Sequence, residues 1–383
     1  MTIDELRRYA VARSLFPPTS LPKALEAFGF VQADPIRAPA RAQDLTLRHR
    51  VTNYRAGELE RRYSRLHVHE DFFINYGFVT DRVFHLMHPR RPGQAPWRVA
   101  RGRHVKGLLE FIRARGPVHP RQVDDHFSLG TVTNYWGGSS SATTHLLDAM
   151  HYRGLLRVVR REAGIRIYGV HEHPAEKGRP QGRPLPTEGV DARERRIRLD
   201  ALVDVVVNIY APLPALSLSS VVRRLRYAAP QWSSALPGAL QRARHRLAHA
   251  RVDGVDWYWP AFAEATAGGP GGEEPGVAEP DDTVRLLAPF DPVVWDRRRF
   301  ELLWNWAYRF EAYTPVPKRR WGYYALPLLW RDRVMGWGNA SVAGRALTLD
   351  VGYVAGRPPR DRRFRQALAD ERARLVAFLE LAG

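Results

Sequence analysis

The sequence predicts an α+β protein made of tandem winged-helix (helix-turn-helix) domains, followed by a β-rich, barrel-like C-terminal domain with a terminal helix. Three observations predict this fold class. The stretch 104–170 has the pattern of three helices and then a hairpin, the same order recurs over 194–259, and the final segment holds three strand-like runs before a closing helix. The predicted domains are 1–100, 101–172, 190–262 and 283–383.

The first domain is predicted from helix and strand patterns that are separated by clear stop signals. Ser20 is a candidate N-cap and Gly29 a helix end, and Pro35 holds Asp34 in an extended conformation. The predicted helices are 3–15, 21–28, 39–48, 55–64 and 80–87, and the predicted extended segments are 30–36 and 66–73.

The central segment carries the most regular pattern in the chain. The predicted helices are 104–115, 119–127 and 142–152. In the first of them, one apolar stripe is formed by Val105, Leu108, Leu109 and Ile112. Two β-rich runs, 155–160 and 165–170, flank a turn with Gly164 and form a predicted wing. In a DNA-binding winged helix the third helix is the recognition helix, although such modules also serve as protein–protein contacts.

The remaining segments repeat this order and then change to strands. Residues 171–193 and 263–282 are rich in Gly, Pro and charge and are predicted linkers. Between them lie predicted helices 194–210, 216–227 and 234–247, and a hairpin of 248–251 and 256–259 around an Asp-Gly turn. Beyond them lie predicted strands 285–290, 323–329, 333–341 and 346–353, and predicted helices 295–304 and 364–381.

Composition points to a polyanionic partner. The 383-residue chain carries a formal net charge of +19, and all but four of its 59 basic residues are Arg, which suits bidentate contacts to phosphate and guanine. The absence of Cys excludes disulfides, zinc ribbons and a Cys nucleophile. The N-terminus does not resemble a secretory signal, and the longest apolar run, 201–216, is broken by polar residues and prolines. We therefore expect a cytoplasmic, nucleoid-associated protein without membrane contact.

Basic residues in the predicted modules are the candidate DNA contacts. They are Arg37, Arg121, His145, Arg153, Arg157, Arg160, Arg161 and Arg166. Two further runs, 296–299 and 318–320, lie beside aromatic residues, so that Arg297, Arg298, Lys318, Arg319 and Arg320 can contact phosphates while the rings stack. The alternative is that these runs are solvated faces and the tryptophans are core. No phosphate-loop, dinucleotide-binding or zinc-protease motif is present, which argues against those chemistries.

Two short polar groups are candidates for chemistry. Gln32 and Asp34 alternate along an extended segment, so an amide and a carboxylate share one side and can hold a water or stabilise a sugar cation. An Asp before Pro is also a common turn residue. His67 and His69 share a strand face and can bind a metal, but no third ligand has a recognisable spacing, so ordinary core or surface histidines are the alternative. Glu70 and Asp71 form a carboxylate pair that can support the Gln32 and Asp34 site, with a solvated strand end as the alternative.

The strings LAPFDPVVWDR (287–297), YRFEAYTP (308–315) and PKRRWGYYALPLL (317–329) are long and specific. They resemble the YcaQ/AlkZ-like family of bacterial DNA glycosylases, and the resemblance covers most of the chain. It implies tandem winged helices around a DNA-binding channel with a β-rich C-terminal domain. It also implies that Gln32 and Asp34 are a catalytic Gln-x-Asp pair, with His69 and Glu70 matching a His-Glu strand near the site. This sequence departs from the family at Ala33 and Pro35.

The resemblance implies hydrolysis of the N-glycosidic bond of N7- or N3-alkylated purines, and unhooking of interstrand crosslinks, by a monofunctional enzyme. The implied partner is double-stranded DNA that contains such lesions, no metal or other cofactor is required, and we expect a monomer. The enzyme is either a general repair factor or one dedicated to a single genotoxic product. The alternative function is a winged-helix transcriptional regulator or another non-catalytic DNA-binding protein.

Overall fold

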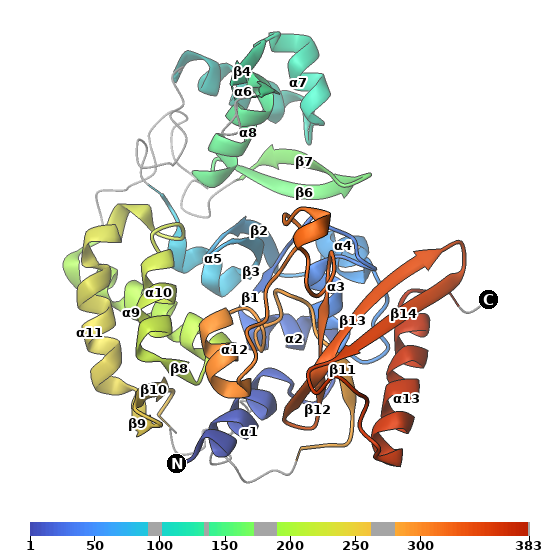
Figure 1. Cartoon of the computed structure of the whole chain (residues 1–383). Coiled ribbons are helices and arrows are strands. Elements are labelled where there is room, and N and C mark those ends of the chain that lie inside the picture. The colour runs from blue at the N-terminus through green and yellow to red at the C-terminus, as the bar shows by residue number, and fades with distance from the viewer. Residues whose placement is uncertain (91–101, 134–137, 172–189, 262–279, 382–383) are drawn as a thin grey trace. The chain divides into compact units, whose positions relative to one another are not determined.

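The computed structural model describes residues 1–90, 102–133, 138–171, 190–261 and 280–381, which fold into helices and small sheets (Figure 1). The mixed α+β class is as predicted. The chain divides into two compact units that are each assembled from separate stretches. Unit 1 contains Met1–Leu59, Val203–Val222 and Leu240–Gly383, and unit 2 contains Glu60–Leu202 and Arg223–Ala239.

The N-terminal part of unit 1 follows its local sequence signals. The elements are α1 (Ile3–Ser14), α2 (Leu21–Phe28), β1 (Phe30–Gln32) and α3 (Ala42–Leu47). Thr2 and Glu5 form a capping box at the start of α1. Gly29 ends α2 with a φ of 69°, a left-handed conformation that glycine adopts without strain. The chain therefore turns at Gly29 out of α2 and directly into β1, which leads to the Gln-x-Asp segment.

The C-terminal part of unit 1 is a curled half-barrel sheet with a closing helix (Figure 1). Its strands run in the order β11 (Val284–Leu286), β12 (Leu326–Trp330), β13 (Arg333–Ala343) and β14 (Ala346–Tyr353), all antiparallel. The helices are α12 (Arg297–Trp304) and α13 (Arg362–Phe378). The buried side of this region packs apolar and aromatic residues of α1, α12 and the sheet.

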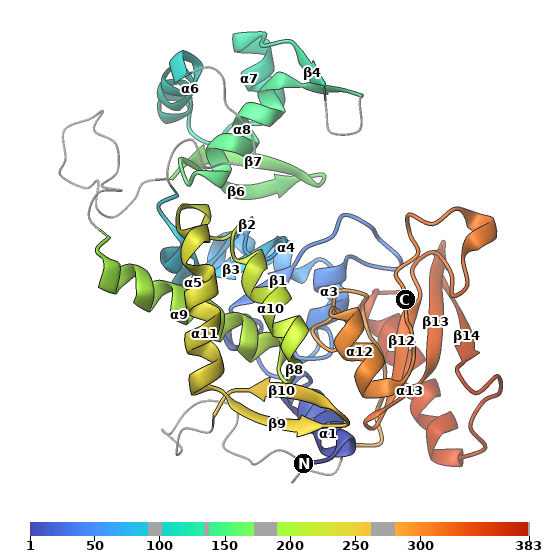
Figure 2. The ribbon, with the colours of Figure 1, turned by 60° about the vertical axis from the view of Figure 1, so that its left-hand side comes forward.

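A tight hairpin of β9 (Ala248–Val252) and β10 (Val255–Trp259) also belongs to unit 1 and lies beside α1 (Figure 2). Asp253 and Gly254 have positive φ values of 48° and 77°, which fit the predicted two-residue turn. Tyr9 of α1 contacts Trp259 with ring centroids 6.5 Å apart. The elements that precede the hairpin are α9 (Ala192–Tyr210), β8 (Leu213–Pro214), α10 (Ala215–Arg224) and α11 (Leu236–Arg246).

Unit 2 contains a hairpin with a helix at its end, and then a helical module with its own hairpin. The first group is α4 (Glu58–Arg62, which begins in unit 1), a short 3₁₀ turn, β2 (Val68–Phe72), β3 (Tyr76–Thr80) and α5 (Asp81–Met87). The second is α6 (Gly102–Arg115), α7 (Pro120–Phe127), β4 (Thr131–Thr133), β5 (Ser139–Ser141), α8 (Ala142–Tyr152), β6 (Leu156–Glu162) and β7 (Ile165–Val170). One apolar core joins α6, α7, α8 and the β6–β7 hairpin.

Most predicted elements are present, and the differences have local reasons. The helix predicted over 39–48 is shorter, and the one over 55–64 divides into α4 and the 3₁₀ turn. Strands β3, β4, β5 and the two-residue β8 were missed. Strands β4 and β5 are three-residue Ser/Thr/Val strands with no apolar period to reveal them. The helix–helix–helix–hairpin orders are present, whereas the winged-helix assignment and the four-domain division stay predictions. Residues 172–189 and 263–279 of the predicted linkers lie outside the described residues.

A buried ion pair fixes the loop after β11 to the N-terminal part of unit 1. Both oxygens of the Asp291 carboxylate accept from Arg50, over 2.7 and 2.9 Å, and both side chains have 0% exposure. Arg50 also donates to the carbonyls of Ser14 and Thr46. Because each guanidinium nitrogen and both carboxylate oxygens have hydrogen-bond partners, the pair holds the segment that carries Trp295.

None of the described helices has a stretch that is both long and apolar enough to cross a membrane.

Candidate functional site

The Gln32 side chain is fixed by an aromatic neighbour from a distant part of unit 1. Trp295 donates its indole N–H to the Gln32 amide oxygen over 2.8 Å. The Trp295 ring itself packs on Tyr210, with centroids 4.8 Å apart. Gln32 is the last residue of β1, so its backbone and its amide are both held. The sequence placed Trp295 next to a basic run and did not reveal this contact.

Asp34 lies in a turn that anchors one oxygen of its carboxylate. Its Oδ1 accepts the backbone N–H of Ile36 over 2.9 Å, which closes a turn across Pro35. The backbone N–H of Asp34 donates to Oε1 of the buried Gln43, over 3.3 Å. No hydrogen bond to Oδ2 is made by any residue that the structure describes. One carboxylate oxygen is thus anchored while the other can act on a bound molecule.

The environment makes Asp34 a stronger base than an exposed aspartate. Partial burial raises the pKa of Asp34, and the hydrogen bond from Ile36 offsets only part of that effect. A carboxylate that has lost some of its solvent interacts more strongly with a nearby cation or proton than one in water. The arrangement therefore fits stabilisation of positive charge or removal of a proton from water.

The charge of Asp34 acts on a residue of an aromatic cluster, Tyr324. After burial, the charge of Asp34 is the next largest cause that raises the pKa of Tyr324. The Tyr324 ring packs edge-on against Phe310, with centroids 5.3 Å apart, and Phe310 contacts Phe290 in the same way at 5.2 Å. Tyr313 also touches Phe310 and is 81% exposed. Aromatic rings of this kind suit stacking on a nucleobase.

His69 belongs to unit 2 and is engaged by its own neighbours. Its Nε2 lies 2.7 Å from Asp81 Oδ1, and its ring stacks on Phe84 with centroids 4.2 Å apart. Burial lowers the pKa of His69, and the hydrogen bond with Asp81 opposes that shift. His67 contacts the same Asp81 carboxylate. Among the residues that the structure describes, no group of three His, Asp or Glu side chains is placed to hold a metal.

Glu70, also in unit 2, is buried in a salt bridge. Its carboxylate accepts two bonds from Arg161, at 2.8 and 2.6 Å, and one from the Tyr76 hydroxyl at 2.6 Å. Burial acts to raise the pKa of Glu70, but Arg161 and Tyr76 outweigh it and lower the pKa. The predicted alternative of a solvated strand end is therefore wrong. Arg161, which the sequence suggested as a DNA contact, is held by Glu70.

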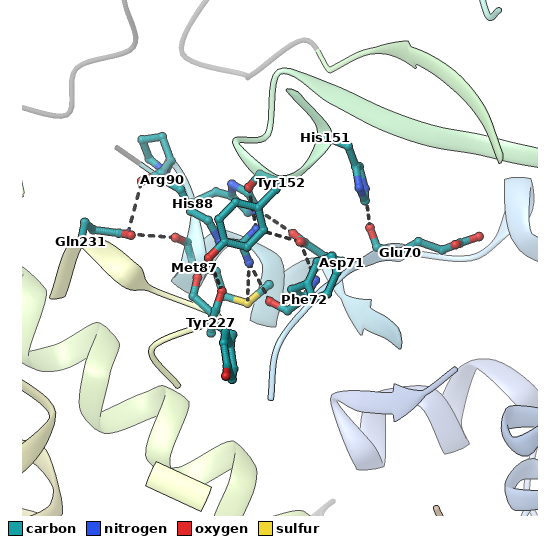
Figure 3. Close-up of polar contacts among 12 residues, drawn as sticks. Glu70, Asp71, Phe72, Met87, His88, Arg90, His151, Tyr152, Tyr227 and Gln231 are labelled. Carbon is teal, nitrogen blue, oxygen red and sulfur yellow. Dashed lines mark hydrogen bonds and ion pairs between the residues drawn. The ribbon is translucent and has the colours of Figure 1, made fainter. Parts of the chain in front are cut away.

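A second buried network lies next to Glu70 in the chain (Figure 3). Asp71 accepts one bond from His88 at 2.6 Å and one from Arg90 at 2.8 Å, and all three side chains are almost completely buried. Arg90 also donates to backbone carbonyls of Phe72, Tyr152 and Ala228. This network stabilises unit 2 rather than offering a site, because its polar groups face one another.

The network predicts that acid destabilises the protein. Burial lowers the pKa of His88 to about 4, so the folded protein keeps this ring neutral while the unfolded chain binds a proton below about 6.5. Stability should therefore fall as the pH drops from 6.5 to 4, by on the order of 3 kcal/mol. The pKa of the buried His151 is also lowered, so this residue adds to the loss of stability in acid. The pKa of Asp71 is lowered too, and its protonation extends the loss of stability below pH 4.

Urea unfolding at pH 7 and pH 4.5 measures this effect. His88→Gln keeps a donor for Asp71 without an ionisable ring, so it should show a weaker pH dependence than the wild type. His85→Gln removes an exposed histidine of α5 and serves as the matched control. Equal wild-type stability at both pH values would show that His88 is not kept neutral by the fold.

The predicted DNA contacts fall into two groups. Six are exposed and available, namely Arg37, Arg121, Arg157, Arg298, Lys318 and Arg320. The others are partly covered or paired: His145, Arg153, Arg297 and Arg319 are half-buried, Arg160 forms a surface pair with Glu162, Arg161 pairs with Glu70, and Arg166 pairs with Asp148.

The basic run 296–299 is not an open charged face. Arg299 is fully buried and donates to backbone carbonyls that include those of Ala211 and Pro212. The guanidinium of Arg297 donates to the carbonyls of Val294 and Pro289 and lies over the Tyr308 ring. The prediction that this run contacts phosphate is therefore wrong for Arg299 and unsupported for Arg297. Only Arg298 is exposed.

Comparisons with known proteins identify a matching family model and a similar fold. The family model described as "DNA glycosylase AlkZ-like" matches residues 25–378. Among solved structures, the Streptomyces sahachiroi DNA glycosylase AlkZ has a similar fold, with a TM-score of 0.60 at 13% sequence identity. The alignment covers 99% of this chain and 96% of that chain.

Proposed function

Because the chain belongs to the AlkZ-like DNA glycosylase family, we propose that it hydrolyses the N-glycosidic bond of N7- and N3-alkylated purines in duplex DNA. Such purines carry a positive charge, so the base leaves as a neutral molecule without prior protonation. The observation that carries the proposal is the Asp34 carboxylate, with one oxygen anchored and the other without a partner among the described residues.

In this mechanism Asp34 acts on the sugar rather than on the base. As the glycosidic bond breaks, positive charge develops on the deoxyribose, and a partly desolvated carboxylate stabilises that charge. The same carboxylate accepts a proton from the water that attacks C1′. Gln32, whose amide oxygen is held by Trp295, positions the water or the sugar-phosphate. The Gln-x-Asp segment carries no lysine for a Schiff base, so we expect no strand-cleaving lyase activity.

Crosslinks that join two guanines through N7 carry the same cationic leaving group on each strand. We therefore infer that the enzyme unhooks them by the same step. We propose that it acts as a monomer, without a metal or organic cofactor, and that DNA approaches its exposed basic residues.

A duplex with one N7-methylguanine tests the proposal. The wild-type protein should release the free base and leave an abasic site that breaks only after treatment with alkali. The same duplex without the lesion should release no base. A specific footprint on undamaged DNA, without release from any alkylated substrate, would instead identify a winged-helix regulator.

The loop before β12 is the strongest candidate for DNA contact in unit 1. Tyr313 and Val316 are 81% and 71% exposed, and Lys318 and Arg320 are exposed beside them. Glu311 is buried and accepts backbone N–H groups from this loop, which holds it in one conformation. Exposed aromatic and basic side chains on a fixed loop suit a nucleic acid, because they combine stacking with phosphate contact.

We expect Lys318→Ala and Arg320→Ala each to weaken binding to duplex DNA of any sequence. Each phosphate contact that is lost should reduce the slope of log K against log salt by about one. Fluorescence anisotropy at several salt concentrations measures this slope. Lys23→Ala removes an exposed lysine of α2 and is the control for net charge. Slopes that match that of the control would exclude this loop from the DNA interface.

A further inference from the structure

The hydroxyl of Tyr324 is buried without a hydrogen bond to the described part of the protein. The side chain is only 3% exposed, and no residue that the structure describes hydrogen-bonds to its hydroxyl. A buried hydroxyl without a partner destabilises a protein, because it has lost its hydrogen bonds to water and gained none in return. Phenylalanine at this position would pack against Phe310 equally well and avoid that penalty. The hydroxyl is therefore better explained by a bond to something that enters during the reaction.

The neighbouring tyrosine shows the contrast. Tyr308 is equally buried, but its hydroxyl donates to the backbone carbonyl of Ala325 over 2.7 Å. That bond gives Tyr308 a structural reason to be a tyrosine. Tyr324 has no such bond, and the nearby charge that acts on it most strongly is that of Asp34. Each of the two residues thus has an oxygen for which the described part of the chain supplies no hydrogen-bond partner, the hydroxyl of Tyr324 and Oδ2 of Asp34.

We propose that Tyr324 is a water-positioning residue, whose hydroxyl and the Asp34 carboxylate together hold the water that attacks C1′ of the damaged nucleotide. This inference rests on the proposed function. Two polar groups that act on each other electrostatically but share no hydrogen bond can be bridged by one water. A water held at two points loses its freedom to rotate before the reaction, and that lowers the barrier to attack.

The step balances without any further reactant. The water oxygen forms a bond to C1′, and the bond between C1′ and the purine nitrogen breaks with its electron pair going to the cationic ring, which leaves neutral. One water proton passes to Asp34 and then to solvent. The Tyr324 hydroxyl keeps its own proton and only orients the water.

The test compares Tyr324→Phe with Tyr308→Phe and Asp34→Asn on a duplex with one N7-methylguanine, under single-turnover conditions. For Tyr324→Phe we expect a rate constant that is about tenfold or more below that of the wild type. In Tyr324→Phe, both the enzyme concentration that gives half-saturation and the melting temperature should stay at their wild-type values. Tyr308→Phe should show the opposite pattern, with a lower melting temperature and the wild-type rate.

Three results would overturn the inference. A Tyr324→Phe rate within about twofold of wild type, with Asp34→Asn inactive, would remove Tyr324 from the reaction and leave the proposed function intact. Parallel losses of rate and melting temperature in both tyrosine variants would assign Tyr324 a structural role. Absence of base release by the wild type on both methylated and crosslinked duplexes would overturn the proposed function and this inference with it.

Discussion

Asp34→Asn should reduce the single-turnover rate of base release by about a hundredfold to a thousandfold, because loss of one transition-state electrostatic group typically raises the barrier by about 3–4 kcal/mol. Asparagine has the same shape, and its oxygen can still accept the Ile36 N–H that closes the turn. The substitution therefore removes the charge without removing the local structure. Release of 7-methylguanine, followed by chromatography, measures the rate.

The matched control is Asp253→Asn. Asp253 is exposed in the β9–β10 turn with a φ of 48°, a conformation that asparagine tolerates well. The substitution Asp253→Asn changes the net charge by the same amount as Asp34→Asn, so any general effect of charge on DNA affinity appears in both variants. Both should bind duplex DNA at least as well as the wild type, and only Asp34→Asn should be slow. Full activity of Asp34→Asn would assign the catalytic charge to another residue.

Asp291→Ala should lower the free energy of unfolding by about 3–5 kcal/mol, because it leaves the Arg50 guanidinium buried and without its carboxylate. Urea unfolding followed by tryptophan fluorescence measures the loss. We also expect slower base release where the variant is still folded, since the ion pair holds the segment that carries Trp295.

Two comparisons separate the buried charge from other effects. Asp281→Ala breaks an ion pair between the exposed Asp281 and the half-buried Arg285, and should change the stability by less than about 1 kcal/mol. The double variant Arg50→Met with Asp291→Leu removes both buried charges and should recover part of the loss. If Asp291→Ala proves no less stable than Asp281→Ala, the buried pair is not a major determinant of the fold.

Features that depend on neighbours in the chain were predictable from the sequence. Gly29 ends α2 and Asp253-Gly254 form a hairpin turn, as their types predict, because backbone conformation at such positions is set by the residue itself. Helices with a clear apolar stripe, such as α6, also lie where they were expected. Short strands without a period, such as β4, were missed.

The site depends on contacts between residues that are far apart in the chain, and local patterns do not show these. The residues alone made Gln32 and Asp34 weak candidates, since a three-residue motif recurs by chance, and the family resemblance then singled them out as a catalytic pair. The support of Gln32 by Trp295 and the open hydroxyl of Tyr324 follow only from the fold. Arg299 was misassigned for the same reason, because the carbonyls that bury it belong partly to residues 211 and 212.

The measurement that tests the central claim most directly compares two forms of one lesion in the same duplex. N7-methylguanine is cationic, whereas its imidazole-ring-opened derivative is neutral and is a poor leaving group. An enzyme that relies on the charge of the base, with Asp34 stabilising the sugar, should release 7-methylguanine and leave the ring-opened base in place. Release of both forms at similar rates, or of neither, would contradict the account.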